Sequence, residues 1–449
     1  MKKIFQYIML AVVTIVMASC TSDIEETTAT TGKNNIQLVV GEFPAFGDSQ
    51  TRAIGTPDEG KTSWAEGDEL LLEIDNTSYG RHNATFTYNG KSWELTSGEL
   101  VYLEGDPAYI SHVYYAPNYK WSNTSLMLKK GKVAGTDELI EGKARITGNG
   151  ETITVSFAEA TRKYSRLRIA TLPNEQITVD TEYFTPAGSS DMEQNGNYTL
   201  TSDEKGNAYL YGTFENNSEV TVKYREAALT TYTFSQATES AKSYALDATV
   251  ISANSAEEIK SAIEQKVADG KTTIRLNLAP NAGTNEFMAI REAIKGAAPN
   301  DLGTIELTII GVETIPEEAF YKMLQLKSVR MSDVKEIKKY AFKECQYLTV
   351  VEAPSLNKLY SGAFRKCDQL SKLTFGPINY ADERNWPIFE YITPNIDLIL
   401  SDYQKEMIET DSYLYTANND RDYAGSDEHN SKNFLGREFR SITCRYPVK

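Results

Sequence analysis

A repeat of 22 residues in the C-terminal part of this chain constrains its fold more than any other feature. Phe320, Phe342 and Phe364 are each followed three residues later by a methionine or cysteine and six residues later by a leucine. This strict period predicts a solenoid, because a single short coil cannot bury its own apolar face and depends on its neighbours to do so. The repeated phenylalanine, sulfur and leucine positions are therefore expected to stack in one core.

Each coil is predicted to contain a short strand, a turn and a helical or 3₁₀ piece that carries the Ala-Phe pair. Cys345 and Cys367 occupy the same position in adjacent coils, which would place them about 5 Å apart along the ladder. Because their Cα–Cβ bonds would run parallel, free thiols are favoured over a disulfide. No CxxC pair is present, so no zinc site is indicated.

The run Ile-x-x-x-Ala-Phe-x-x-Cys-x-x-Leu that begins at Ile337 resembles the repeat of BspA-type leucine-rich repeat proteins. The resemblance implies an α/β leucine-rich repeat solenoid over residues 312–449, including a C-terminal cap. Upstream, residues 251–311 contain two helix-then-strand patterns whose strands would begin at Ile274 and Ile305. These are expected to be longer coils that open the solenoid, because the ends of such a stack need caps that keep its core out of water.

Residues 36–250 follow a different pattern, in which short runs of alternating apolar and polar residues are separated by Gly, Asn and Asp. Alternation rich in Tyr, Thr, Val and Phe predicts half-buried strands, and turn signals every 10 or so residues predict antiparallel sheets. The length suits either one or two β-sandwiches. With two, the first would span 36–162 and the second 163–250. In either case the chain is predicted to be a multidomain protein, because it is too long for one core.

Four stretches of this half carry a further resemblance: "TSWAEGDELLLEI", "TFTYNGKSWEL", "AYISHVYYAPNYKW" and "VSFAEATRKYSRLRIA". Taken in this order, they resemble the fimbrillin-like proteins of Bacteroidetes. The resemblance implies transthyretin-like β-sandwiches, as found in pilus stalk, anchor and tip subunits. The pair Ala158 and Glu159 departs from the family pattern, in which a histidine often follows the phenylalanine, so the subgroup stays open.

The first residues are expected to serve export rather than the fold. Two lysines precede a short apolar run that ends "MASC", and this run is shorter than the about 20 residues that a membrane-spanning helix needs. It predicts a lipoprotein signal peptide over residues 1–19. Cys20 resembles the lipidated cysteine of a bacterial lipobox and is the predicted lipidation site. Residues 20–35, rich in threonine and acidic residues, predict a solvated tether.

These features predict a lipoprotein of the outer membrane that is exposed on the cell surface. Asp23, Glu25 and Glu26 resemble the signal that sends some lipoproteins to the outer face of that membrane. In the stretch "QTRAIG", Arg52 lies where fimbrillin-like pilins can be cut by a trypsin-like protease. The alternative is an ordinary exposed arginine in a loop.

Residues that could carry catalysis are few and scattered. His82, His112 and His429 belong to no catalytic or metal-binding motif, and no phosphate-binding or dinucleotide-binding motif is present. A segment near residue 420 is spaced like a calcium loop, but Ala424 and Ser431 stand where ligands belong. No enzyme activity, cofactor or metal is therefore predicted. The formal net charge of −16 argues against nucleic acid as a partner.

Two groups of residues are candidates for binding. Tyr114, Tyr115, Tyr119 and Trp121 lie on one aromatic strand and its continuation; exposed, they could stack on sugar rings, and buried, they are inward residues of a sandwich. In the solenoid, the strand residues that alternate with core positions are expected to face outward. This candidate binding face comprises Glu306, Thr308, Ser328, Arg330, Val350, Glu352, Lys372 and Thr374.

The sequence thus predicts a non-catalytic surface lipoprotein, and three functions are open. The first is an adhesin whose leucine-rich repeats recognise a host or bacterial protein or glycan. The second is a tip or accessory subunit of a strand-exchange (type V-like) pilus, with pilus subunits as partners. The third is a glycan-binding surface lipoprotein. The outer membrane is a further predicted partner, through the lipid on Cys20.

Overall fold

The computed structural model describes residues 37–46, 61–77, 80–99, 108–123, 125–147, 152–157, 162–225, 227–382, 386–402, 433–435 and 437–446. The chain divides into two compact units, and each is described by itself. The first unit consists of Met1–Ala170, Val179–Val220 and Tyr232–Asp247, and the second of Thr171–Thr178, Thr221–Thr231 and Ala248–Lys449.

The first strands form a β-sandwich of two sheets around one core. One sheet has the order β4-β3-β2-β5-β8 and is antiparallel throughout, with β2 (Glu69–Asn76), β3 (Gly80–Tyr88), β4 (Trp93–Gly98), β5 (Ala108–Tyr115) and β8 (Ile140–Glu141). The other has the order β1-β10-β9, with β1 (Gln37–Val40), β9 (Lys143–Thr147) and β10 (Thr152–Ser156). Leu72 from the first sheet and Ile153 from the second are fully buried in the shared core. The predicted alternation holds because every second strand residue faces this core.

The following seven strands form one sheet, in the order β16-β15-β12-β14-β11-β17, with β13 paired to β12. They are β11 (Ser165–Ala170), β12 (Gln176–Pro186), β13 (Glu193–Thr201), β14 (Asn207–Phe214), β15 (Glu219–Tyr224), β16 (Ala227–Thr233) and β17 (Ser243–Asp247). The second sandwich over 163–250 stays a prediction, since one hydrogen-bonded sheet can fold over on itself into two layers. At 11 residues, β12 pairs with β13, β14 and β15 and so joins all seven strands into one sheet.

The expectation of purely antiparallel pairing is also corrected. β1 runs parallel to β10, and β17 runs parallel to β11. Both are edge strands of their sheets, each added beside a partner from a distant part of the sequence. Hydrophobic alternation is the same for parallel and antiparallel half-buried strands, so it does not reveal this difference.

The repeat region is built from two parallel sheets. These sheets link successive coils, and we call the set of linked coils the coil stack. The larger sheet has the order β18 (Ile251–Ala253), β19 (Thr273–Leu278), β20 (Ile305–Ile310), β22 (Leu326–Arg330), β24 (Val350–Ala353), β26 (Lys372–Phe375), β28 (Asp397–Ser401) and β31 (Ser441–Tyr446). The smaller has the order β21 (Thr314–Ile315), β23 (Glu336–Ile337), β25 (Lys358–Leu359) and β27 (Tyr380–Ala381). The predicted register holds in both, since Val329 pairs with Val351 and Ile315 with Ile337.

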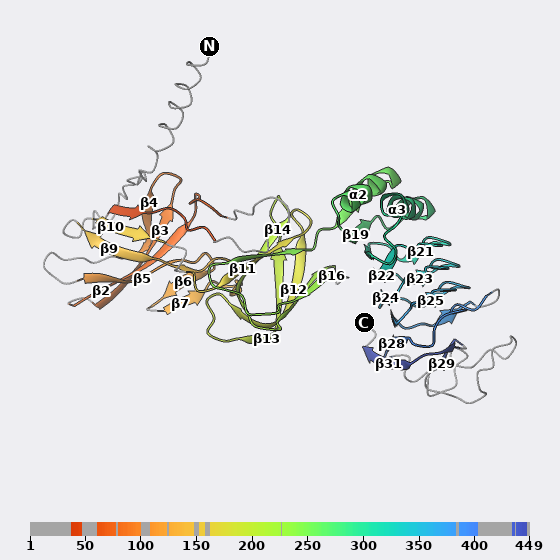
Figure 1. Ribbon diagram of the computed structural model, residues 1–449. Helices are drawn as coiled ribbons and strands as arrows, with labels where there is room; N and C mark the ends of the chain where they lie inside the picture. The colour runs from red at the N-terminus through yellow and green to blue at the C-terminus, as the bar shows by residue number, and fades with distance from the viewer. Residues whose placement is uncertain are drawn as a thin grey trace, which may run out of the picture. The chain divides into compact units, whose positions relative to one another are not determined.

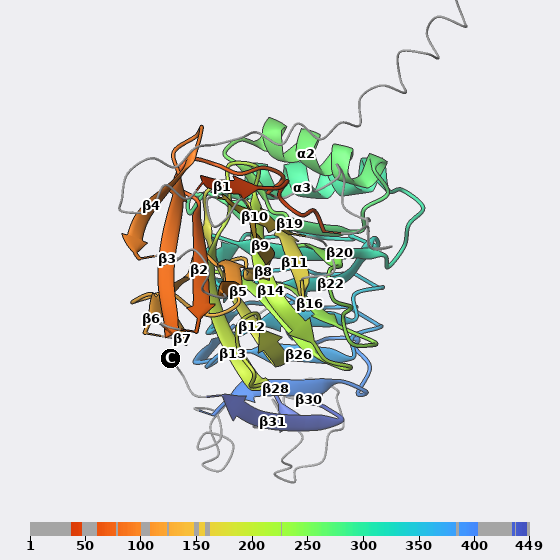
Figure 2. The same cartoon turned by 90° about the vertical axis from the view of Figure 1, so that its left-hand side faces the viewer.

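Helices α2 (Ala256–Ala268) and α3 (Thr284–Ala297) lie side by side at one end of the coil stack, with β28 and β31 at the other end (Figures 1 and 2). Ser255 caps α2, because its Oγ accepts a hydrogen bond from the Glu258 amide at 3.3 Å. Phe287 of α3 packs edge-on against Phe320, with ring centroids 5.6 Å apart. The helices therefore occupy, in the first coils, the place that the Ala-Phe segments take in the later ones.

The repeated phenylalanines stack as the period predicts. The ring centroids of Phe320 and Phe342 are 5.1 Å apart and those of Phe342 and Phe364 are 5.4 Å apart, with interplanar angles of 22° and 5°. All three side chains are fully buried, as are the methionine, cysteine and leucine side chains of the same coils. One continuous core therefore runs through the coil stack.

The segments that carry the Ala-Phe pairs are turns, and the prediction of helical or 3₁₀ pieces is wrong. In the middle coil the amides of Tyr340, Phe342 and Glu344 donate hydrogen bonds of 2.8–3.2 Å to carbonyls of the next coil, whereas the amides between them donate within their own coil. Tyr340 and Glu344 have positive φ values of 57° and 61°, which interrupt a right-handed helical path. The coils gain a third hydrogen-bonded side in this way.

A further coil lies beyond the strict period. Phe389 stacks on Phe364 with ring centroids 5.7 Å apart and an interplanar angle of 9°, although the two residues are 25 positions apart in the sequence. The hairpin of β29 (Asn433–Phe434) and β30 (Arg437–Glu438) follows, and Phe439 packs edge-on against Phe389 at 5.6 Å. Because this coil has three extra residues, the period of 22 does not predict Phe389.

Replacing Phe342 by alanine tests the stacked core. Because the ring is fully buried between two others, the cavity should cost about 3–5 kcal/mol of stability. Calorimetry of the full chain should show the transition of the repeat region at a lower temperature and that of the sandwich unchanged. Phe86→Ala, in the sandwich core, should lower the transition temperature of the sandwich and leave that of the repeat region unchanged. A joint shift of both transitions in either variant would contradict independent cores.

Candidate interaction surfaces

The eight residues of the candidate binding face lie on strands β20, β22, β24 and β26, in two neighbouring rows. From strand to strand, successive partners in the first row are Glu306, Ser328, Val350 and Lys372. Those in the second row are Thr308, Arg330, Glu352 and Thr374. Because parallel strands are in register at each step, the spacing of 22 brings equivalent side chains together. The sequence therefore placed these residues in the sheet correctly; whether they bind anything stays a prediction.

The charges of this face are largely satisfied within it. Arg330 Nε lies 2.9 Å from Glu352 Oε2, and Lys372 Nζ lies 3.6 Å from Glu352 Oε1. The exposure expected of this face is wrong for Thr308 and Ser328, which are buried. Arg275, also buried on this sheet, donates from Nε to the Leu229 carbonyl at 2.6 Å within the second compact unit. The face thus offers fewer free groups than its composition suggests.

The Ala-Phe turns carry a second surface, which the search for outward strand residues missed. We call it the turn surface and define it by Tyr321, Lys322, Lys339, Tyr340, Lys343, Arg365, Lys366, Trp386 and Tyr391. Cations lie over aromatic rings along it. Lys343 Nζ is 5.0 Å from the ring centroid of Tyr321 and 4.9 Å from that of Tyr340, and the Arg365 guanidinium is 4.2 Å from the ring of Trp386.

Gly362 lets this surface continue from one coil to the next. It has a φ of +63°, and a Cβ built on it would lie 2.6 Å from the Tyr340 ring and 3.7 Å from Trp386 Cβ. Tyr340 therefore lies directly over the glycine and beside Trp386. The signal was present in the sequence, because the residues one and two positions after each repeated phenylalanine are Tyr, Lys, Arg or Glu.

The two repeat cysteines are free thiols in the core, as predicted. Cys345 Sγ donates to the Phe320 carbonyl and Cys367 Sγ to the Phe342 carbonyl, both at 3.0 Å. Burial raises the pKa of Cys345 to about 12 and also raises the pKa of Cys367. At neutral pH both remain protonated, unreactive packing groups.

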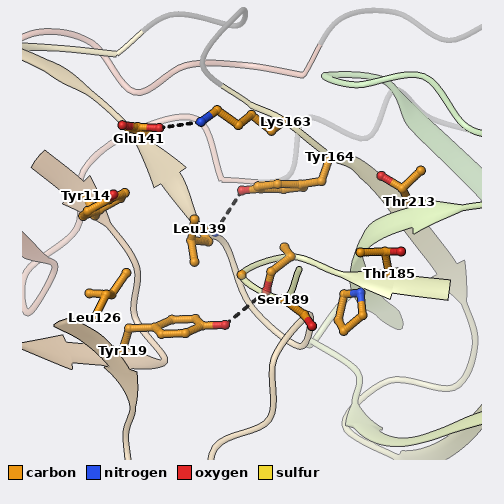
Figure 3. Close-up of a pocket in the computed structure, with 13 residues that line it drawn as sticks. Tyr114, Tyr119, Leu126, Leu139, Glu141, Lys163, Tyr164, Thr185, Ser189 and Thr213 are labelled. Carbon is orange, nitrogen blue, oxygen red and sulfur yellow. Dashed lines mark hydrogen bonds and ion pairs between the residues drawn. The ribbon is translucent and has the colours of Figure 1, made fainter. Parts of the chain in front are cut away.

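A cavity of about 350 Å³ lies in the first compact unit (Figure 3). Its wall includes Tyr114 of β5, Leu126, Thr185 and Thr213. Leu126 belongs to the hairpin formed by β6 (Tyr119–Ser122) and β7 (Ser125–Leu128). Most polar groups around it are already paired. Tyr119 Oη donates to the Ala187 carbonyl at 3.1 Å, and Lys163 lies 2.8 Å from Glu141.

The aromatic strand is thus divided between two faces. Tyr115 is buried in the sandwich core, and Tyr119 is buried beside the cavity. Tyr114 and Trp121 are half-buried, and burial is the largest cause that raises the pKa of Tyr114. The buried alternative is right for Tyr115 and Tyr119, and Tyr114 presents part of its ring to the cavity.

The remaining predicted residues give no site. Cys20, Arg52, His429 and the calcium-loop-like segment lie outside the described residues. His112 stacks on Tyr114 with ring centroids 5.7 Å apart and lies 3.9 Å from Glu141, and His82 lies on β3. Among the described residues, no group of three or more His, Cys, Asp or Glu is placed to hold a metal ion. In the same part of the chain, no helix has the length and apolarity needed to cross a membrane.

The match to a family model agrees with the coil stack. The family described as "BspA type Leucine rich repeat region" matches residues 302–408 in six copies. A solved leucine-rich repeat protein of T. pallidum matches at 17% identity with a TM-score of 0.17, over 21% of this chain and 58% of that one, which is less than two thirds of its length. No curated protein matches the chain.

The matched segment defines the class of this part of the protein, which is a leucine-rich repeat domain. More narrowly, residues 302–408 form a BspA-type leucine-rich repeat domain, carried behind a strand-rich N-terminal half. Leucine-rich repeats indicate a role in protein interaction. The fimbrillin-like resemblance of the N-terminal half is not confirmed and stays a prediction of the sequence.

Proposed function

We propose that this protein is a non-catalytic adhesin of the cell surface that recognises a partner protein through its leucine-rich repeats. The observation that carries the proposal is the coil stack itself, in which the core is closed by repeated apolar residues and polar side chains are left on the outer faces. A rigid stack of this kind presents side chains at fixed spacing, which reduces the entropy lost on binding. In this proposal the coils form a leucine-rich repeat solenoid.

The N-terminal half would connect this domain to the membrane. In our proposal Cys20 is lipidated after removal of residues 1–19, residues 20–35 form the tether, and the fimbrillin-like half separates the repeats from the lipid. The lipid would place the protein on the outer membrane with its repeats exposed. The proposal needs no cofactor, metal or nucleic acid.

A second function, as a tip or accessory subunit of a pilus, is favoured by the position of β1. This strand and Phe43 precede Arg52 in the sequence, so a cut at Arg52 would leave them held without a covalent link. Leu38 and Phe43 are buried, and Trp64 Nε1 donates to the Gly41 carbonyl at 2.8 Å. Loss of the segment would open an apolar edge along β10, where a strand from another subunit could add.

The same cut would separate the lipid on Cys20 from everything after Arg52. Lipid anchoring and release of β1 therefore exclude each other once the segment dissociates. At the other end, β31 already pairs with β28 in the larger sheet and is not a free strand for donation. These points favour the adhesin over a repeatedly polymerising pilin, and leave a single place at a pilus tip as the alternative.

A binding array tests the proposed function. The full chain, expressed with Cys20→Ser to keep it free of lipid, is applied to host and bacterial surface proteins and to glycans. We expect saturable binding to one or a few proteins, with glycan spots blank. Binding to glycans alone would reject recognition of a partner protein and would favour the third function.

Cell fractionation with labelled fatty acid tests the anchor and the cut. The wild-type protein should take up label and stay with the outer membrane, whereas Cys20→Ser should take up none. Arg52→Gln should behave like the wild type if Arg52 is an ordinary loop residue. Label in both Cys20→Ser and the wild type would contradict the anchor. Unlabelled wild-type protein in pilus fractions, lost in Arg52→Gln, would favour the pilus function instead.

A further inference from the structure

The charges of the coil stack are distributed unevenly among its three sides. On the larger sheet, Glu352 pairs with both Arg330 and Lys372, and on the smaller sheet Glu336 lies 2.6 Å from Lys358 and also pairs with Lys338. Hydrogen bonds from Lys338 and Lys358 lower the pKa of Glu336. The cations of these two sides thus have carboxylate partners at close range.

The turn surface has an excess of cations at its centre. Leaving out Lys338, which pairs with Glu336, the residues within four positions of Phe342 and Phe364 include four basic and two acidic side chains, a net formal charge of +2 in a chain of −16. The Nζ atoms of Lys322, Lys343 and Lys366 lie 3.6, 3.9 and 3.9 Å from carboxylate oxygens of Glu344. One carboxylate cannot neutralise three ammonium groups, so this part of the surface keeps positive potential.

Exposed aromatic rings border these cations. Trp386 is 40% and Tyr391 52% exposed, and Arg365 lies over both rings while pairing with the Glu390 carboxylate. Arg365 is therefore already fixed before any partner arrives, which lowers the entropy lost on binding. Trp, Tyr and Arg are the residue types that contribute most at protein interfaces.

We propose that the turn surface, rather than the outer face of the larger sheet, is where the repeats bind, and that its partner is an acidic protein segment that carries aromatic or apolar side chains. The proposal rests on the proposed function, since it names the surface and the partner chemistry for the same domain. Carboxylates of the partner would reach Lys339, Lys343 and Lys366, and its apolar groups would cover Trp386 and Tyr391. The acidic remainder of the chain would repel such a partner elsewhere and direct it to this surface.

The test uses a glutamate–tyrosine copolymer as the probe and two matched variants of the full chain. Lys339→Glu with Lys366→Glu alters the turn surface, and Arg330→Glu with Lys372→Glu alters the sheet face by the same change of net charge. All four side chains are at least partly exposed, and an unchanged melting temperature verifies folding. A third variant, Trp386→Ala, removes an aromatic contact without changing the charge.

We expect the wild type to bind the copolymer, more weakly as salt screens the charges. The turn-surface variant should bind about tenfold or more weakly, as charge reversal opposite carboxylates should cause, and Trp386→Ala should bind several-fold more weakly. The sheet-face variant should stay close to the wild type. A lysine–tyrosine copolymer, which the acidic remainder of the chain attracts, should lose no affinity in the turn-surface variant.

Three results would overturn the inference. Loss of binding in the sheet-face variant alone would assign recognition to the larger sheet and leave the proposed function intact. Binding of heparin without binding of the copolymer would assign the surface to an anionic glycan. Binding of array proteins that is unaffected by the turn-surface variant would place recognition elsewhere. In contrast, a wild-type chain that captures no protein on the array rejects the proposed function itself.

Discussion

The contact between one coil and the next is the interaction on which the repeat region depends. No coil contains enough apolar surface to fold alone, and each buries its phenylalanine between the rings of its neighbours. The same step from coil to coil sets the backbone pairing on all three sides and aligns the side chains outside the core. The ion pairs of the sheets and the cation–aromatic contacts of the turn surface are consequences of one register. A change in that register would alter the core and both surfaces together.

The period predicted the core and the strands because it reports which residues are buried. It did not predict the conformation of the Ala-Phe segments. Those segments turn at Glu318, Tyr340 and Gly362, all of which have positive φ. Of these three residues, only the glycine is of a type that predicts a positive φ from the sequence. The repeat pattern predicted a helical or 3₁₀ piece, whereas alternate amides of these segments donate to the neighbouring coil. Phe389 was missed for a simpler reason, since its coil is three residues longer.

The candidate binding face shows the difference between placing a residue and assigning its role. Alternation placed Arg330, Glu352 and Lys372 on the outer face correctly, but it could not show that they pair with one another. The pair of Arg330 and Glu352 could have been inferred from opposite charges 22 positions apart, whereas Lys372 is 20 positions from Glu352 and lies diagonally across from it. The turn surface was missed because its residues lie in what was expected to be a helix. In the N-terminal half, alternation found the strands of the sandwich, but neither the parallel pairing of β1 nor the joining of seven strands into one sheet follows from alternation. Cys20 and Arg52 remain predictions of the sequence.

Residue-resolved hydrogen exchange of the native protein is the most direct test of whether the coils are joined on all three sides. If coils bond to one another through their turns, the amides of Phe320 and Phe342 and of their alternate neighbours should be protected nearly as well as those of the strands. Protection should recur at the same positions every 22 residues. Exchange throughout these turns at the rate of an unstructured peptide, while the strands remain protected, would contradict the claim that the coils are joined on all three sides.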